Sequence, residues 1–155
     1  MEVEAIVNSH PLTYNTLSDD TIEPLSPNNL LTMKTKVVLP PPGVFQREDV
    51  YCRKRWRAVQ HLANEFWSRW RKEFLLGLQE RQKWDVARPN LEIGDVVLLV
   101  DDDLKRNKWP MGRIVGVFPG DDGLVRKVDV KTAASATPLT RSVLKVVLLL
   151  KCPSA

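Results

Sequence analysis

The densest cluster of positive charge in the sequence is the run RKRWR, Arg53 to Arg57, in which four of five residues are cationic. No acidic residue lies among them, so these groups repel one another unless a counter-charged partner is bound. Guanidinium and ammonium groups are the usual protein ligands of phosphate. The run therefore indicates contact with a polyanion, and the same five residues also fit a nuclear-import signal.

Side chains that could carry out covalent chemistry are few and are not grouped. The two histidines, His10 and His61, fall in a turn region and on a basic helix, and no serine stands in a G-x-S-x-G setting. The two cysteines are far apart, whereas structural zinc sites present their ligands in close pairs. The acidic runs Asp101 to Asp103 and Asp121-Asp122 occur in turns, where Asp bonds to the local backbone. We therefore expect no catalytic residue, no metal site and no cofactor.

The positive charge is concentrated in the middle of the chain. The 155 residues are 43% apolar and 27% charged, which is typical of a globular protein. The formal net charge is +4, yet residues 1–46 hold two Lys and Arg against five Asp and Glu, whereas residues 47–83 hold ten against five. A polyanion is therefore expected to approach the central segment.

The sequence lacks the usual marks of a secreted or membrane protein. Its start has no basic region followed by an apolar stretch of signal-peptide length, and its longest apolar run, Val146 to Leu150, is far shorter than a membrane span. The two distant cysteines do not form the framework of a disulfide-rich domain. These features predict an intracellular protein, cytoplasmic or nuclear, with no membrane partner.

A long amphipathic helix is predicted over residues 47–85. The stretch from Arg47 to Trp84 has no proline and a single glycine, and its apolar residues recur at three- and four-residue spacing. At about 1.5 Å per residue, an unbroken helix here would be roughly 45–50 Å long. The predicted apolar stripe comprises Val59, Ala63, Phe66, Trp70 and Phe74, and it is widened by Trp67 and Leu78. The predicted cationic face, which is either solvated or in contact with a partner, comprises Arg53, Arg57, His61, Asn64, Ser68 and Lys72.

A small β-barrel is predicted over residues 89–152. After Pro89 the apolar period changes to two residues, and GDVVLLV reads as a turn followed by a strand. Further strands are predicted at Gly112 to Phe118, at Leu124 to Lys131, and in TRSV and LKVVLLL. PGDDG is a hairpin turn, and Ala133 to Thr137 is a second turn. Five short strands at this spacing favour a barrel over a sandwich.

Residues 1–46 are predicted to be a largely irregular N-terminal extension. Its first ten residues can form about two turns of helix, after which prolines and the turn formers of Ser18 to Asn29 stop it. Pro40 to Pro42 favour an extended polyproline spacer, with a ligand for a proline-binding domain as the alternative. The predicted fold class is therefore α+β, with an irregular N-terminal segment, a long helix and a five-stranded barrel.

The order of these segments resembles the C-terminal region of a BEL/Pao-type LTR retrotransposon pol polyprotein. The resemblance covers nearly the whole chain and rests on the stretches VEAIVNSHPLTY, EPLSPNNLL, PPGVF, YCRKRWRAVQHLANEFWSRWRKEFLLGLQERQKW, LEIGDVVLL and WPMGRIVGVFPGDDGLVRKVDVKT. It implies the region after the integrase catalytic core, ending in an SH3-like barrel, with DNA as partner, DNA integration as process and the nucleus as location. The metal-binding acids of that family belong to the core, so Glu2 and Glu4, in what resembles the helix that closes it, take no catalytic role.

Together these features predict a non-catalytic module that positions retroelement DNA through phosphate contacts, with little sequence specificity. The candidate contacts on the helix are Arg53, Lys54, Arg55, Arg57, Arg69, Arg71, Lys72, Arg81 and Lys83. The candidate contacts on the barrel are Lys105, Arg106, Lys108, Arg113, Arg126, Lys127 and Lys131. Trp109, in the basic loop, is a candidate for stacking on a base, with a lid over the barrel as the other interpretation.

A protein-interaction role is the alternative hypothesis. Trp56, Trp67 and Trp70 lie near the helix seam, where tryptophan more often packs in a core or against a partner. A helix with so wide an apolar face would leave hydrophobic area in water unless it paired with a second copy or with the integrase core. The barrel would then read a host chromatin protein, although Trp109 and Phe118 are too few for a methyl-lysine cage.

Overall fold

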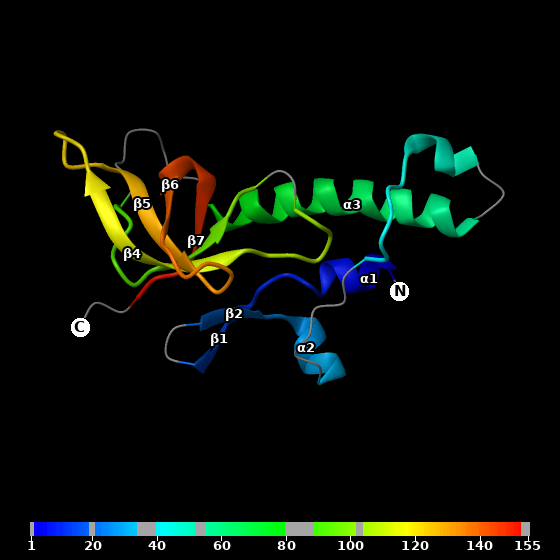
Figure 1. Cartoon of the computed structure of the whole chain (residues 1–155), viewed down its shortest axis with the longest axis horizontal. Helices are drawn as coiled ribbons and strands as arrows, with labels where there is room; N and C mark the ends of the chain where they lie inside the picture. The colour runs from blue at the N-terminus through cyan, green and yellow to red at the C-terminus, as the bar shows by residue number, and fades with distance from the viewer. Residues whose placement is uncertain are drawn as a thin grey trace.

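One long helix and one five-stranded antiparallel sheet form the framework of the protein. The computed structural model of the chain describes residues 2–18, 21–33, 40–51, 55–79, 89–101 and 104–152. Figure 1 shows the helix α3 running from one end of the molecule to the sheet at the other, with the N-terminal elements lying alongside. The predicted α+β class is confirmed.

The sheet contains the five strands that the sequence predicts. They are β3 (Val96–Leu99), β4 (Met111–Pro119), β5 (Val125–Thr132), β6 (Leu139–Ser142) and β7 (Val146–Leu150), in the order β6-β5-β4-β3-β7. The last strand thus lies beside the first, and a three-residue 3-10 turn, η2 (Val143–Lys145), leads into it. Among the described strands no pairing joins β6 to β7, so the sheet is not closed into a barrel.

The run VVLL of β3 is buried along its whole length because both faces of this strand are covered. Val96 and Leu98 belong to a core shared with α3, whereas Val97 and Leu99 pack inside the curved sheet with Ile114 and other residues of β4, β5 and β7. A strand covered on both faces reads as a continuous apolar run. The register of β4 against β5 shifts after Ile114, and such bulges bend a strand.

The predicted turns of the sheet are confirmed. The Gly120 N–H donates to the Leu124 carbonyl at 2.9 Å, and Gly123 has a φ of 73°, which glycine adopts without strain. The described residues of the segment between β3 and β4 form a loop that runs alongside α3 toward the N-terminal helix (Figure 1).

The helix α3 (Arg55–Leu78) has 24 residues and is shorter than predicted. A 3-10 helix, η1 (Arg47–Tyr51), precedes it, while residues 52–54 and 80–88 lie outside the described residues. The buried face of α3 comprises Gln60, Ala63, Trp67, Arg71 and Leu75.

The predicted apolar stripe of this helix is confirmed in part, since Ala63 is buried and Phe66, Trp70 and Phe74 are partly buried against the same core. The prediction was wrong for Val59, which is 46% exposed. The physical reason is that Gln60 and Arg71 find hydrogen-bond partners inside the protein, so two polar side chains occupy the face that hydrophobicity alone assigns to other residues.

The prediction of a largely irregular N-terminal segment was also wrong. Residues 2–33 contain α1 (Glu2–Val7), the hairpin of β1 (Thr13–Ser18) and β2 (Thr21–Leu25), and α2 (Pro27–Thr32). Ile6 and Ile22 are buried in the core that α3 shares with the sheet. A six-residue helix is unstable in isolation, so α1 depends on this packing, which local sequence patterns do not reveal.

Candidate nucleic-acid interface

A buried polar network joins three distant segments of the chain. The Arg106 Nη2 atom donates to Gln60 Oε1 at 2.6 Å and to Glu2 Oε2 at 3.1 Å, and its Nη1 atom donates to Asn64 Oδ1 at 3.1 Å. Gln60 Nε2 in turn donates to Glu2 Oε1 at 3.0 Å. The network ties α1 and the loop between β3 and β4 to the first half of α3.

The environment of Arg106 explains why this cation is structural. Burial lowers the pKa of its guanidinium group, and the negative charge of Glu2 acts in the opposite direction. A buried cation is tolerated only when it is paired and hydrogen-bonded, as Arg106 is. Arg106 therefore anchors the loop instead of contacting a phosphate, which corrects its prediction as a surface ligand.

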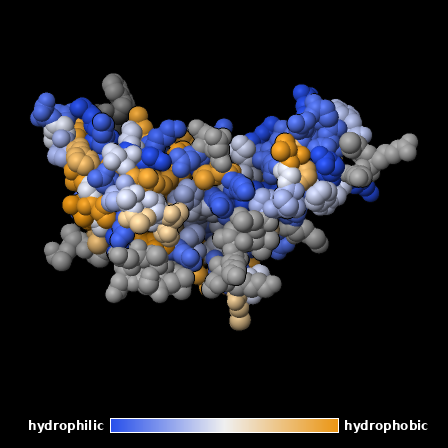
Figure 2. Space-filling view, viewed as in Figure 1, coloured by the Kyte–Doolittle hydropathy of each residue, from blue (hydrophilic) through white to orange (hydrophobic). Residues whose placement is uncertain are grey.

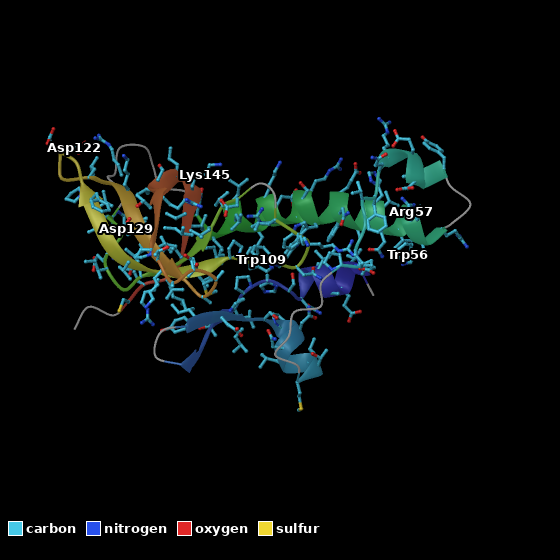
Figure 3. All side chains as sticks on the ribbon, viewed as in Figure 1. Trp56, Arg57, Trp109, Asp122, Asp129 and Lys145 are labelled. Carbon is cyan, nitrogen blue, oxygen red and sulfur yellow. The ribbon has the colours of Figure 1, made fainter. Side chains whose placement is uncertain are left out.

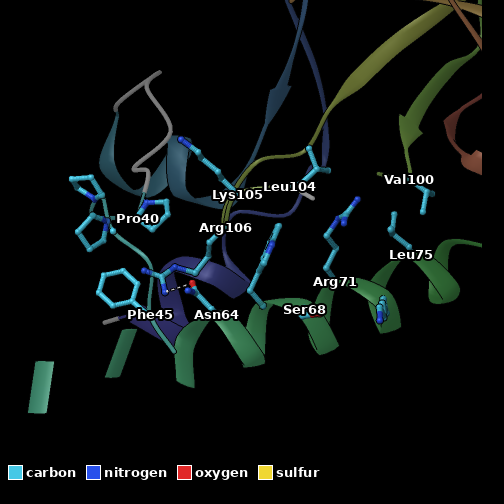
Figure 4. A pocket seen from close by; sticks show the side chains of 15 residues that line it. Pro40, Phe45, Asn64, Ser68, Arg71, Leu75, Val100, Leu104, Lys105 and Arg106 are labelled. Atoms are coloured by element: carbon cyan, nitrogen blue, oxygen red, sulfur yellow. Dashed lines mark hydrogen bonds between the residues drawn. The ribbon is translucent and has the colours of Figure 1, made fainter. Parts of the chain in front are cut away.

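Beside this network lies a groove with a volume of about 660 Å³. Figure 4 shows its walls: α3 on one side, the loop after β3 on another and, at one end, the proline segment formed by residues 40–45. Among the described residues that line it, four are cations and none is Asp or Glu. We call this the basic groove, and its lining comprises Pro40, Pro41, Pro42, Gly43, Phe45, Asn64, Trp67, Ser68, Arg71, Lys72, Leu75, Val100, Leu104, Lys105 and Arg106.

The four cations of the basic groove differ in their exposure. Arg71 is buried, and its Nη1 atom donates to the backbone carbonyl of Asp101 at 2.7 Å. Lys72 and Lys105 are exposed and come from α3 and from the loop, so they are the two ammonium groups that a ligand can reach. Asn64, Ser68 and Lys72, which were predicted to share a polar face of the helix, do line one groove.

The proline end of the groove is held by contacts with the start of α3. Phe45 packs edge-on against Trp56 at 5.4 Å between ring centroids, and the guanidinium group of Arg57 lies 5.7 Å from the Phe45 centroid. Arg57 Nε also donates to Asp49 Oδ1 at 2.7 Å, and the hydrogen bonds to Asp49 from Arg57 and from the Gln46 backbone lower the pKa of that carboxyl group. Arg57, predicted to bind phosphate, is thus engaged by an acid of its own chain.

Trp109 is a core residue, and its prediction as a stacking residue was wrong. Only 6% of its surface is exposed, and its ring meets Trp67, Trp70 and Phe74 edge-on at centroid distances of 5.1–5.8 Å. Figure 3 shows Trp109 alongside α3, and its Nε1 atom donates to Ser9 Oγ at 3.1 Å. A buried indole whose donor is satisfied has no face left for a base.

The predicted cations of the sheet do not converge on the basic groove. Arg126 pairs with Asp122 at 2.6 Å near the tip of the β4–β5 hairpin, and Arg113 lies over the ring of Tyr14 at 6.0 Å. Lys131 lies opposite Arg113 in the register of β4 and β5, and Lys127 is exposed near the start of β5. These residues lie on the sheet, at the opposite end of the molecule from η1 (Figure 1).

The remaining predicted contacts divide into two groups. Arg55, Arg69 and Lys108 are exposed and do not line the basic groove. Arg53, Lys54, Arg81 and Lys83 lie outside the described residues. Figure 2 shows that hydrophilic surface gathers over η1 and the start of α3, where Arg55 stands, while hydrophobic patches are more frequent over the sheet.

Sequence reasoning missed the apolar part of the basic groove. Pro40 to Pro42 were assigned to a spacer and Phe45 received no role, yet all four line the groove. The signal that could have found them is the PPPGVF stretch itself, because a rigid polyproline segment that ends in an aromatic residue is well suited to form a wall.

Neither a membrane span nor a metal-binding cluster is found in the described part of the chain. None of its helices is long and apolar enough to cross a membrane. The same residues contain no group of three His, Cys, Asp or Glu side chains placed to hold a metal ion.

Residues 54–149 match a family model whose description is "Family of unknown function (DUF5641)". This region contains α3 and all of the sheet except Leu150, the last residue of β7. It includes every lining residue of the basic groove except Pro40 to Gly43 and Phe45. Comparisons with curated proteins and with solved structures gave no match.

Proposed function

Since the chain belongs to DUF5641, a family whose description names no activity, we propose from its own surface that it is a non-catalytic module that binds nucleic-acid backbone. The observation that carries this proposal is the basic groove, where the described lining residues include four cations and no acid. Clefts of one charge sign focus the electric field and attract counter-charged ligands. Phosphate contacts of this kind carry little sequence information.

The resemblance to the C-terminal region of a BEL/Pao integrase supports the same proposal. We propose that the sheet, although not closed, has the strand arrangement of an SH3-like barrel, because its last strand returns to the side of its first and a 3-10 turn precedes that strand. In this proposal the module positions retroelement DNA for an integrase core. Fewer cations are available for phosphate than the sequence suggests, because Arg57, Arg106 and Arg126 each have an acidic partner within the chain.

A salt titration of oligonucleotide binding tests this proposal. We expect the affinity for fluorescent oligonucleotides to fall steeply as salt is added. The salt slope, which is the slope of log K against log salt concentration, should be roughly −0.7 per phosphate contacted on a single strand and −0.9 per phosphate on a duplex. The groove variant Lys72→Glu/Lys105→Glu should reduce affinity at least tenfold. Its matched control, Lys127→Glu/Lys151→Glu, changes the net charge equally at exposed positions outside the groove and should change affinity far less.

Two results contradict the proposal. One is the absence of salt-sensitive binding to any oligonucleotide. The other is an equal loss in both double variants, because that pattern reports the overall charge and not the basic groove.

Self-association through α3 is a second candidate, favoured by one observation. Leu62 and Leu76, two turns on either side of Arg69, are 53% and 66% exposed on the outer face of the helix. An antiparallel second copy would place Leu62 opposite Leu76 of its partner. Glu65 and Glu73, one turn to either side of Arg69, would then lie near the arginine of the other copy.

Light scattering of charge-insertion variants tests this second candidate. Leu62→Glu/Leu76→Glu should convert a dimer to a monomer, whereas Leu30→Glu/Leu31→Glu, at comparably exposed positions of α2, should leave the dimer intact. A wild-type chain that is monomeric at high micromolar concentration would exclude the dimer. Oligonucleotide binding by the monomeric variant shows whether the two activities are separate.

A further inference from the structure

The shape of the basic groove restricts the kind of nucleic acid that it can admit. Building on the proposed function, we propose that the groove binds single-stranded nucleic acid, with phosphates at Lys72 and Lys105 and bases against the wall formed by Pro40–Pro42 and Phe45. Three properties of the groove lead to this inference: its size, the placement of its reachable cations and the chemistry of its wall.

The groove is too small for a duplex. A sphere of 660 Å³ is about 11 Å across, which is less than the roughly 12 Å width of the major groove of B-form DNA alone. The volume lies within the range of about 300–1,000 Å³ found for sites that enclose small organic ligands. A strand whose bases and phosphates are separately accessible can enter such a space, whereas a paired helix can only touch its rim.

The reachable cations stand on two different walls. Lys72 belongs to α3 and Lys105 to the loop after β3, and both side chains are exposed at the groove. The buried network of Arg106 with Gln60 and Asn64 fixes that loop against α3 and so sets the distance between the two walls. A backbone that lies between the walls can therefore meet an ammonium group on each side.

The third wall is apolar and rigid. Proline has no N–H donor and holds a fixed φ, and Phe45 is fixed by its contacts with Trp56 and Arg57. In Figure 4 Pro40 and Phe45 lie together at one end of the groove, while Lys105 stands on the loop after β3 and Arg71 farther along α3. An apolar wall beside cations suits a single strand, which exposes base faces, and offers nothing to a duplex, whose base faces are stacked inside.

Competition measurements with four defined probes test this inference on the full chain. The probes are an eight-nucleotide single strand, a blunt duplex of the same sequence, a mononucleotide and poly-glutamate. We expect the single strand to bind at least tenfold more tightly than either the duplex or the mononucleotide, and poly-glutamate to compete poorly at equal charge. The salt slope for the single strand should be roughly −1.4, as expected for two phosphates.

Variants of the two kinds of wall sharpen the test. Lys105→Glu should weaken single-strand binding and reduce its salt slope by roughly 0.7. Phe45→Ala should weaken single-strand binding by about 5- to 150-fold, the range for loss of one stacked base, without changing the slope. The conservative variant Phe45→Leu, which keeps an apolar side chain, controls for local unfolding. Lys151→Glu, at an exposed position just after β7, should change neither quantity.

The outcomes separate this inference from the proposed function. Equal affinity for duplex and single strand, both lost on Lys72→Glu/Lys105→Glu, would overturn the single-strand inference and leave the backbone-binding function intact. Equally tight binding of the mononucleotide would also overturn the inference, because the site would then be a nucleotide pocket. Effective competition by poly-glutamate, or no binding of any oligonucleotide, would overturn both.

Discussion

The indole of Trp109 touches three aromatic rings of α3, and its N–H group is satisfied by Ser9. The sequence, which places this tryptophan in a basic loop, suggests an exposed side chain that binds a ligand. In the structure the loop packs against α3, and the indole is buried there. The cationic side chains of Lys105 and Lys108 in the same loop are exposed to solvent.

Substitution of Trp109 should affect stability and not binding. Trp109→Ala should destabilise the fold by about 3–5 kcal/mol in urea unfolding, as for other buried aromatic residues. Trp109→Phe keeps most of the ring packing and should fold with a smaller loss, with oligonucleotide affinity unchanged. A folded Trp109→Phe protein of wild-type stability that no longer binds oligonucleotides would restore the stacking role.

Asp49 holds the start of α3 through Arg57, and its charge state makes this anchor pH-dependent. Its folded-state pKa lies below the ordinary value of 3.8, mainly because of the hydrogen bond from Arg57. A carboxyl group with a lowered pKa stabilises the folded state fully above its unfolded pKa. That contribution is lost as the pH falls through the folded pKa.

Comparison with Asp49→Asn isolates this anchor from other acid effects. Near neutral pH the variant should be less stable than the wild type, and this difference should shrink as the pH falls below about 4. The measurement is the free energy of urea unfolding at a series of pH values. A difference that stays constant from neutral pH to pH 3 would show that the carboxylate charge is not responsible.

At the scale of elements, the β4–β5 pair depends on a close approach at Gly112. A Cβ atom there would lie 2.4 Å from Val130 Cγ1 and 2.7 Å from the Lys131 backbone oxygen. Both distances are far below van der Waals contact, and the backbone oxygen cannot rotate away. The absence of a side chain at Gly112 therefore allows β4 and β5 to approach closely at this point of the hairpin.

Two glycine substitutions with opposite expected signs test this point. Gly112→Ala should destabilise the protein by about 1–3 kcal/mol through overpacking. Gly77→Ala, in α3, meets nothing within 4 Å and should stabilise it by up to about 1 kcal/mol, because alanine favours the helix. Thermal unfolding of both variants gives the answer, and a neutral Gly112→Ala would mean that the sheet relaxes more easily than its register suggests.

At the scale of the whole molecule, the N-terminal residues belong to the same folded body as the helix and the sheet. Ile6 of α1 is fully buried, and Glu2 contributes to the network around Arg106. The family match begins at residue 54, so these contacts come from outside the matched region. They also support one wall of the basic groove through Arg106.

Ile6→Ala should therefore lower the stability of the entire protein. We expect a loss of about 2–5 kcal/mol in a single urea transition that includes the sheet. Val3→Ala, on the exposed side of the same helix, is the matched control and should change little. Separate unfolding of α1, with the main transition unaltered in Ile6→Ala, would show that the N-terminal segment is a detachable extension.

The sequence alone determined the local elements of this protein. The two-residue alternation of Val128 and Val130, the glycines of the Pro119–Gly123 turn and the proline-free stretch around α3 act over a few residues, so their patterns predict the strands, the turn and the helix. The concentration of cations between residues 47 and 83 is likewise visible without a structure.

Only the tertiary structure decided which of these cations a ligand can reach. Arg106 is buried because Glu2 and Gln60, 104 and 46 residues away along the chain, accept hydrogen bonds from its guanidinium group. Whether a polar side chain faces water or the interior depends on such distant partners, because burial is costly without them and tolerated with them. The same dependence placed Gln60 and Arg71 on the buried face of α3, drew Trp109 into the core and left Lys72 and Lys105 at the basic groove.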